Sequence, residues 1–90
     1  GQEIPYSTAV TIETFKEKPR MIEIYATIHV ERTSQKAIVI GRGGAKLKQI
    51  GRAAREDMER MLGAKVFLKL FVRVQKNWSR DTRALRKFGY

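Results

Sequence analysis

Residues 21–31 and 65–74 alternate between apolar and polar side chains with a period of two. This period is typical of a β-strand, because successive side chains of a strand point to opposite faces. We therefore predict two strands that each bury one face. The positions expected to face the core are Ile22, Ile24, Ala26, Ile28 and Val30 in the first strand and Val66, Leu68, Leu70, Val72 and Val74 in the second.

Residues 8–16 are also rich in β-forming side chains, although their alternation is less regular. The charged stretch that follows contains Pro19, which favours a turn. We predict that residues 8–16 turn back and pair antiparallel with residues 21–31.

A different period begins after residue 45. Apolar residues recur at steps of three and four from Leu47 to Met61, and charged residues fill the other positions. This spacing predicts an amphipathic α-helix of about five turns, which Gly63 would end. A second, short helix is predicted at the C-terminus, where Ser79 is a suitable N-cap.

Residues 34–40 are ambiguous from propensity alone. Ile38, Val39 and Ile40 are β-branched, which favours a strand, whereas Ser34 could cap the start of a helix. Propensity is a weak guide that tertiary contacts override, so both readings stay open at this point.

The chain has 90 residues, which is enough for one small domain with a modest core. It contains no cysteine, so disulfides and thiolate metal sites are excluded and a reducing cytoplasm suits it. No apolar run approaches the length of a membrane span, and the first residues do not resemble a signal peptide. We expect a soluble, cytoplasmic protein.

The net charge is +10, from 19 basic and nine acidic residues. Residues 32–55 contain seven Lys and Arg side chains and no acid. So large a surplus on a small domain favours a polyanionic partner, and nucleic acid is the first candidate. The alternative is a basic docking module for an acidic membrane surface or a protein partner.

Three glycines lie within this basic segment, at positions 41, 43 and 44. Glycine lets the main chain approach a sugar-phosphate strand closely, and the start of the following helix offers N–H groups to an anion. The segment lacks the Gly-Lys-Ser/Thr ending of a nucleotide-hydrolysing loop and the spacing of a dinucleotide-binding one. The sequence also offers no carboxylate pair, nucleophile with its base, or metal cluster, so we expect neither an enzyme nor a cofactor.

The run Val39-Ile40-Gly41-Arg42-Gly43-Gly44, followed by Leu47 and Ile50, resembles the signature of the KH family. KH modules hold about four nucleotides of single-stranded nucleic acid across this GxxG loop. The element order resembles the type II arrangement. It implies an α+β fold, with a three-stranded mixed sheet packed by helices and a helix-GxxG-helix unit, and residues 34–40 then become helix.

A narrower resemblance covers nearly the whole chain and points to the C-terminal KH domain of the Era family of bacterial GTPases. It rests on Glu3-Ile4-Pro5-Tyr6-Ser7, on Val30-Glu31-Arg32 before Ser34-Gln35-Lys36, on Ile50-Gly51 with Ala54-Arg55, on Trp78 with Arg83-Ala84-Leu85-Arg86, and on Gly89-Tyr90. Many relatives have Lys where this chain has Arg42, which keeps the charge and puts only a lysine-specific contact in question.

This resemblance implies that residues 1–7 are a linker from an upstream GTPase domain and that residues 8–90 are the KH domain. It further implies binding to the 3′ end of small-subunit ribosomal RNA during assembly of the small ribosomal subunit, with peripheral membrane contact as a further expectation. The implied RNA-binding residues are Gly41, Arg42, Gly43, Gly44, Lys46, Lys48, Lys36 and Arg32, with Ile38 and Ile40 as an apolar floor under the bases.

Three aromatic residues share the second face of the predicted sheet: Tyr25, Phe67 and Phe71. They could stack bases, pack across strands, or be covered by another domain. His29 lies on the polar side of its strand, where we expect it to be exposed.

Overall fold

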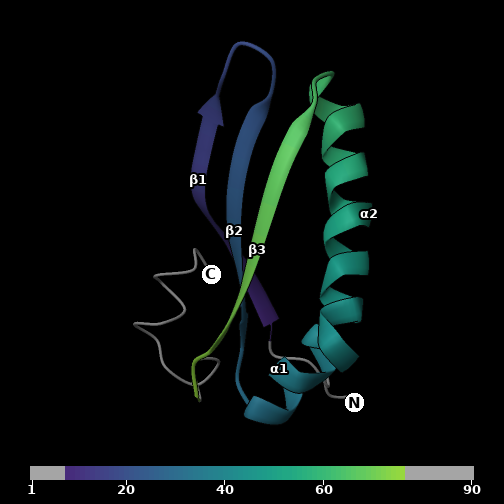
Figure 1. Ribbon diagram of the computed structural model, residues 1–90. Coiled ribbons are helices and arrows are strands. Elements are labelled where there is room, and N and C mark those ends of the chain that lie inside the picture. The colour runs from purple at the N-terminus through teal and green to yellow at the C-terminus, as the bar shows by residue number, and fades with distance from the viewer. Residues whose placement is uncertain (1–7, 77–90) are drawn as a thin grey trace, which may run out of the picture.

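The computed structural model describes residues 8–76 (Figure 1). Its elements follow the order strand, strand, helix, turn, helix, strand. The bounds are Thr8–Glu17 for β1, Ile22–Val30 for β2, Thr33–Ile40 for α1, Arg42–Gly44 for the 3-10 turn, Ala45–Leu62 for α2 and Val66–Val74 for β3. The predicted linker at residues 1–7 and the predicted helix from Ser79 lie outside the described residues.

The three strands form one mixed sheet in the order β1-β2-β3. β1 pairs antiparallel with β2 as the predicted hairpin, and the register shifts once, between Ile12 and Thr14. β3 pairs with β2 in parallel, from Ile22 opposite Val66 to Val30 opposite Val74. The two helices supply the crossover that a parallel pair requires. The predicted α+β fold with a three-stranded mixed sheet is confirmed.

α1 confirms the helical reading of residues 34–40, but Ser34 is not its N-cap. The helix begins one residue earlier, at Thr33. The side-chain amide oxygen of Gln35 instead accepts hydrogen bonds from the backbone N–H groups of Glu31 and Arg32, at 2.9 and 2.8 Å. Gln35, the third residue of the helix, therefore satisfies the backbone donors of Glu31 and Arg32 just before the first turn, as the third residue of a capping box does.

α2 confirms the predicted amphipathic helix and ends at Gly63, which adopts a left-handed conformation. Its apolar side packs on β3, and α1 lies beside it across one end of the sheet (Figure 1). Among the described helices, none is long and apolar enough to cross a membrane.

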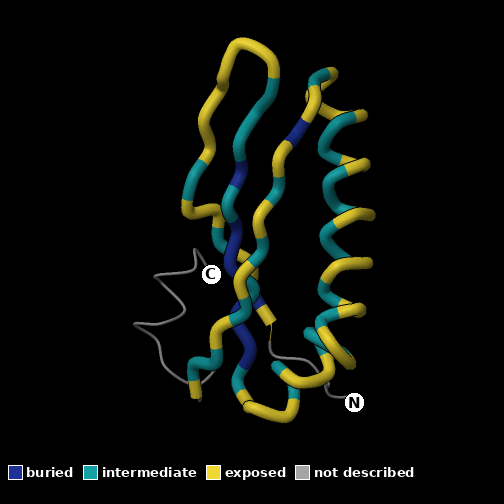
Figure 2. Tube along the Cα trace, in the orientation of Figure 1, coloured by how far each residue is buried: buried dark blue, intermediate teal, exposed yellow. Residues whose placement is uncertain are grey.

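The buried residues gather on the central strand β2, as Figure 2 shows. Ile24, Ala26 and Val30 are buried there, whereas neither helix buries a residue completely. His29 is also buried, at 4 % exposure, so the expectation that it is exposed was wrong. His29 is buried because β2 is the central strand, with β1 and β3 on either side of it. Its Nε2 atom lies 2.8 Å from the Thr11 hydroxyl of β1.

Candidate nucleic-acid interface

The glycine loop joins α1 to α2 through three residues with positive φ. Gly41 has φ 75° and ψ −179°, Gly43 has φ 62° and Gly44 has φ 81°. Non-glycine residues adopt such angles only at a cost. Three positive φ angles within residues 41–44 explain why the sequence concentrates glycine at this turn.

The three glycines serve different purposes. A Cβ on Gly41 would lie 2.5 Å from the Cβ of Lys46, which is closer than real atoms approach, whereas a Cβ on Gly43 or Gly44 would meet nothing within 4 Å. Gly41 thus lets the chain fold back against α2. The other two leave main chain open to solvent, where a ligand can reach it.

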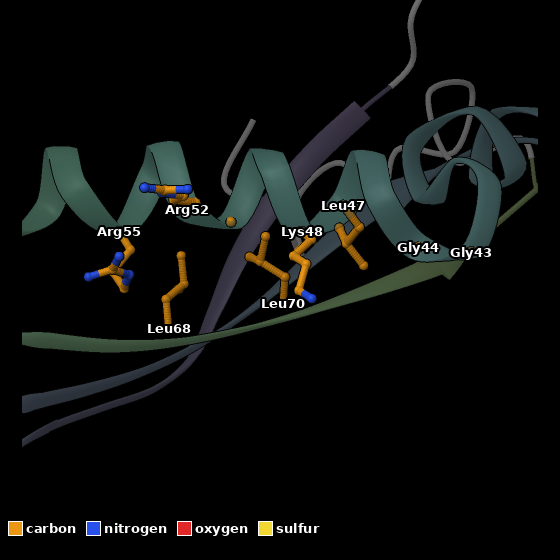
Figure 3. A pocket seen from close by; sticks show the side chains of 9 residues that line it. Gly43, Gly44, Leu47, Lys48, Arg52, Arg55, Leu68 and Leu70 are labelled. Carbon is orange, nitrogen blue, oxygen red and sulfur yellow. The ribbon is translucent and has the colours of Figure 1, made fainter.

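A groove of about 550 Å³ opens beside this loop and runs between α2 and β3 (Figure 3). Its lining comprises Gly43, Gly44, Leu47, Lys48, Gly51, Arg52, Arg55, Leu68 and Leu70. Figure 3 shows Leu68 and Leu70 on β3 beneath the helix that carries the other side chains. The groove therefore has an apolar floor from the strand and a cationic rim from the helix.

Helical spacing organises the α2 side of the groove into two neighbouring rows. Gly44, Lys48 and Arg52 are four residues apart, and so are Leu47, Gly51 and Arg55. The first row carries two cations at the rim. The second row faces the strand, and at Gly51 a Cβ would lie 3.4 Å from the Cδ1 atom of Leu70. The absent side chain at Gly51 keeps the groove open in its middle.

Arg55 is held at the far end of the groove by Glu59. Its Nη1 atom donates to both carboxylate oxygens of Glu59 at 3.2 Å, and the same carboxylate accepts the backbone N–H of Val66 at 2.9 Å. The hydrogen bond from Val66 is the main cause that lowers the pKa of Glu59 below its ordinary value of 4.5, and the charge of Arg55 acts in the same direction. Glu59 thus ties the end of α2 to the start of β3.

We predict that Glu59→Gln lowers the melting temperature at neutral pH and that its difference from wild type shrinks in acid. A carboxylate whose pKa is depressed by folding adds stability above its unfolded pKa and loses it as the pH falls through the folded pKa. The window therefore lies below about pH 4.5. Circular dichroism melts from neutral to strongly acid pH measure this. Glu56→Gln is the matched control, because within residues 8–76 Glu56 forms its ion pair with the exposed Arg52. An equal pH dependence in both variants would contradict the role of Glu59.

The structure distributes the residues that the resemblance implied over three places. Gly43, Gly44 and Lys48 line the groove. Gly41, Arg42 and Lys46 belong to the adjoining loop and the start of α2. Lys36, Ile38 and Ile40 lie on α1, where Ile38 is 72 % exposed, and Arg32 precedes that helix; none of these four lines the groove.

Six groove residues were absent from the implied set: Leu47, Gly51, Arg52, Arg55, Leu68 and Leu70. The signal for part of them was present in the sequence. Gly51 interrupts an amphipathic helix at the spacing of Leu47 and Arg55, where helix propensity alone gives no reason for glycine. The alternation of β3 predicts Leu68 and Leu70 only as core residues. Nothing in that strand indicates that α2 leaves both leucines partly exposed to solvent.

Known proteins resemble this chain in sequence and in fold. The family model described as a KH domain matches residues 3–79. The chain is 57 % identical over 90 residues to GTPase Era of Stenotrophomonas maltophilia, and 56 % identical to GTPase Era of Geobacter metallireducens. The two matches include 100 % and 98 % of this chain but only 30 % of the length of each relative.

Solved structures give the same result. A crystal structure of Aquifex aeolicus Era bound to GDP·AlF4− superposes with a TM-score of 0.91 at 41 % identity, over 100 % of this chain and 31 % of that one. Era in complex with MgGDPNP and nucleotides 1506–1542 of 16S ribosomal RNA also gives 0.91, at 38 % identity, over 99 % of this chain and 31 % of that one. The chain therefore belongs to the KH-domain family, and along its whole length it is similar to the C-terminal portion of GTPase Era.

Proposed function

We propose that this chain binds single-stranded RNA with the backbone crossing the glycine loop and the bases lying in the groove between α2 and β3. The observation that carries the proposal is the joining of a bare, positive-φ turn to a groove with an apolar floor and a cationic rim. Phosphates suit the loop and the lysine and arginine row, and unstacked bases suit the leucine floor.

The dimensions of the groove support a short single strand. From Gly44 to Arg55 the helix rises by about 16 Å, a length suited to the roughly four nucleotides that KH modules hold. Arg42 and Lys46 add charge at the loop end, and we assign them phosphate contacts. Lys36 and Arg32 extend the positive field, and Ile38 and Ile40 remain candidates for contact with a base outside the groove.

The RNA that we propose is the 3′ end of small-subunit ribosomal RNA, bound during assembly of that subunit in the cytoplasm. The similar Era protein solved with nucleotides 1506–1542 of 16S ribosomal RNA supports this assignment. The chain spans about a third of such relatives. We therefore propose that residues 8–90 act as the RNA-binding domain and that residues 1–7 link it to an upstream GTPase domain.

A basic docking module is the alternative function, and the net charge of +10 favours it. In that case the basic surface would meet acidic lipid in peripheral contact with the membrane, or an acidic protein. The charge alone would suffice for this purpose. The open glycine turn and the leucine floor would then have no function, so we prefer RNA.

Competition between ligands tests the proposal. We expect a short single strand with the 3′-terminal sequence of small-subunit ribosomal RNA to bind more tightly than a scrambled strand, and both to bind more tightly than a duplex. Contact with about four phosphates gives a log-log salt slope near −3. Fluorescence anisotropy over a salt series measures both quantities. Equal binding of the three nucleic acids, together with tighter binding to acidic vesicles, would favour the docking alternative.

A further inference from the structure

The outer face of β3 carries an alternating row of cations and aromatic rings, on the side of the sheet away from α2. This row, called here the β3 stripe, consists of Lys65, Phe67, Lys69, Phe71 and Arg73. All five side chains are exposed, and the two phenylalanines keep 44 % and 42 % of their surface in contact with solvent. Neighbouring members lie about 7 Å apart along the strand. None of these five residues lines the groove in which we propose that RNA binds.

The rings of the stripe form one cluster with Tyr25 of β2. The Tyr25 ring centroid lies 6.3 Å from those of both Phe67 and Phe71. Lys69 is the register partner of Tyr25, and its Nζ atom lies 5.9 Å from the Tyr25 centroid and 5.4 Å from that of Phe71. The neighbouring acid, Glu23, pairs with Lys18. The stripe thus combines clustered rings with three cations, of which Lys65 also acts electrostatically on the Glu59 carboxylate.

We propose that the β3 stripe is a second surface for single-stranded RNA, on which bases stack against Phe67 and Phe71 while Lys65, Lys69 and Arg73 contact phosphates. Aromatic rings interleaved with cations are the arrangement that binds single strands without strong sequence preference. A protein partner fits less well, because lysine is depleted at the centre of protein interfaces.

The position of β3 connects the two surfaces. β3 is an edge strand, and its other face supplies Leu68 and Leu70 to the groove. An RNA longer than the groove can therefore pass around this edge and reach the stripe without crossing another element of residues 8–76. This second surface depends on the proposed function in one respect: β3 contributes side chains both to the groove and to the stripe.

RNA length separates the two surfaces experimentally. Binding is measured for a tetranucleotide and for a single strand about three times as long. Phe67→Ala/Phe71→Ala should weaken the longer RNA by about tenfold or more, since each stacked base contributes substantially, and should change tetranucleotide binding by less than about twofold. Phe15→Ala is the matched control: Phe15 is 51 % exposed and pairs with Ile24, which places it on the opposite face of the sheet.

A second variant tests the stripe without removing rings. Lys65→Gln/Lys69→Gln/Arg73→Gln should reduce the salt slope for the longer RNA by roughly 2 and leave the tetranucleotide slope unchanged. In wild type, the ring signals of Phe67 and Phe71 in 13C NMR spectra should shift with the longer RNA only. Equal losses for both RNAs, or no loss for the longer one, would overturn the second surface. Failure of the groove itself appears separately, as tetranucleotide binding that survives the double substitution Arg42→Asp/Gly43→Asp.

Discussion

The double substitution Arg42→Asp/Gly43→Asp is expected to weaken single-stranded RNA binding by at least about 100-fold while the domain stays folded. It places two carboxylates where the phosphates would pass and removes one cation. Folding should survive, because Asp tolerates the left-handed angles of Gly43 better than most residues and a side chain there meets open space. Fluorescence anisotropy measures binding, and circular dichroism verifies the fold.

The chain offers a control with the same chemistry at the other end of the molecule. Arg20→Asp/Gly63→Asp makes the same change in charge, and Gly63 is also left-handed, at φ 64°, with no atom within 4 Å of an added Cβ. We expect this control to bind RNA within about threefold of wild type, since distant exposed charges are screened. If both double variants lose binding equally, the loop has no special role and only total charge matters.

Gly41→Ala is expected to cost about 2–4 kcal/mol in free energy of unfolding. Its angles, φ 75° and ψ −179°, lie in a region that is nearly restricted to glycine. The added Cβ would also lie 2.5 Å from Lys46 Cβ and 3.0 Å from the Lys46 backbone nitrogen, so the start of α2 would have to move. Urea denaturation followed by circular dichroism measures the loss.

Gly63→Ala is the milder reference for both causes, because Gly63, at φ 64° and ψ 32°, lies in the left-handed α region that other residues can adopt. Gly63 shares a positive φ but has open space around it, so we expect a cost of only about 1–2 kcal/mol. If Gly41→Ala proves no more destabilising than Gly63→Ala, neither the backbone angles of Gly41 nor the close approach of Lys46 constrains the loop. Gly41 would then have to be explained by access for RNA, as the family resemblance implies for all three glycines.

The sequence predicted the elements of this domain better than their assembly. The period-two alternation of β2 and β3 and the apolar spacing of α2 are properties of each segment alone, and all three elements formed as predicted. α1 could not be predicted in this way, because Ile38, Val39 and Ile40 favour a strand. Only the resemblance to KH domains decided for a helix, and the structure supplies the physical reason in the Gln35 hydrogen bonds and in packing against α2 and β3.

The candidate site was predictable at its loop but not at its floor. Three glycines among cations mark the loop in the sequence itself. The floor depends on how α2 lies over β3, which no local pattern specifies, so Leu68 and Leu70 read as ordinary core. His29 shows the same limit, because its burial follows from its place on the central strand rather than from its neighbours in the sequence.

The central claim is that RNA occupies the groove between α2 and β3, and NMR titration of the 15N-labelled chain with a single-stranded RNA of about four nucleotides tests it most directly. We predict that the largest amide shifts occur at Gly43, Gly44, Gly51, Leu68 and Leu70, with little change along β1. Shifts spread evenly over the basic surface, with Gly51 and Leu70 unaffected, would contradict the account and leave the charge as a general docking feature.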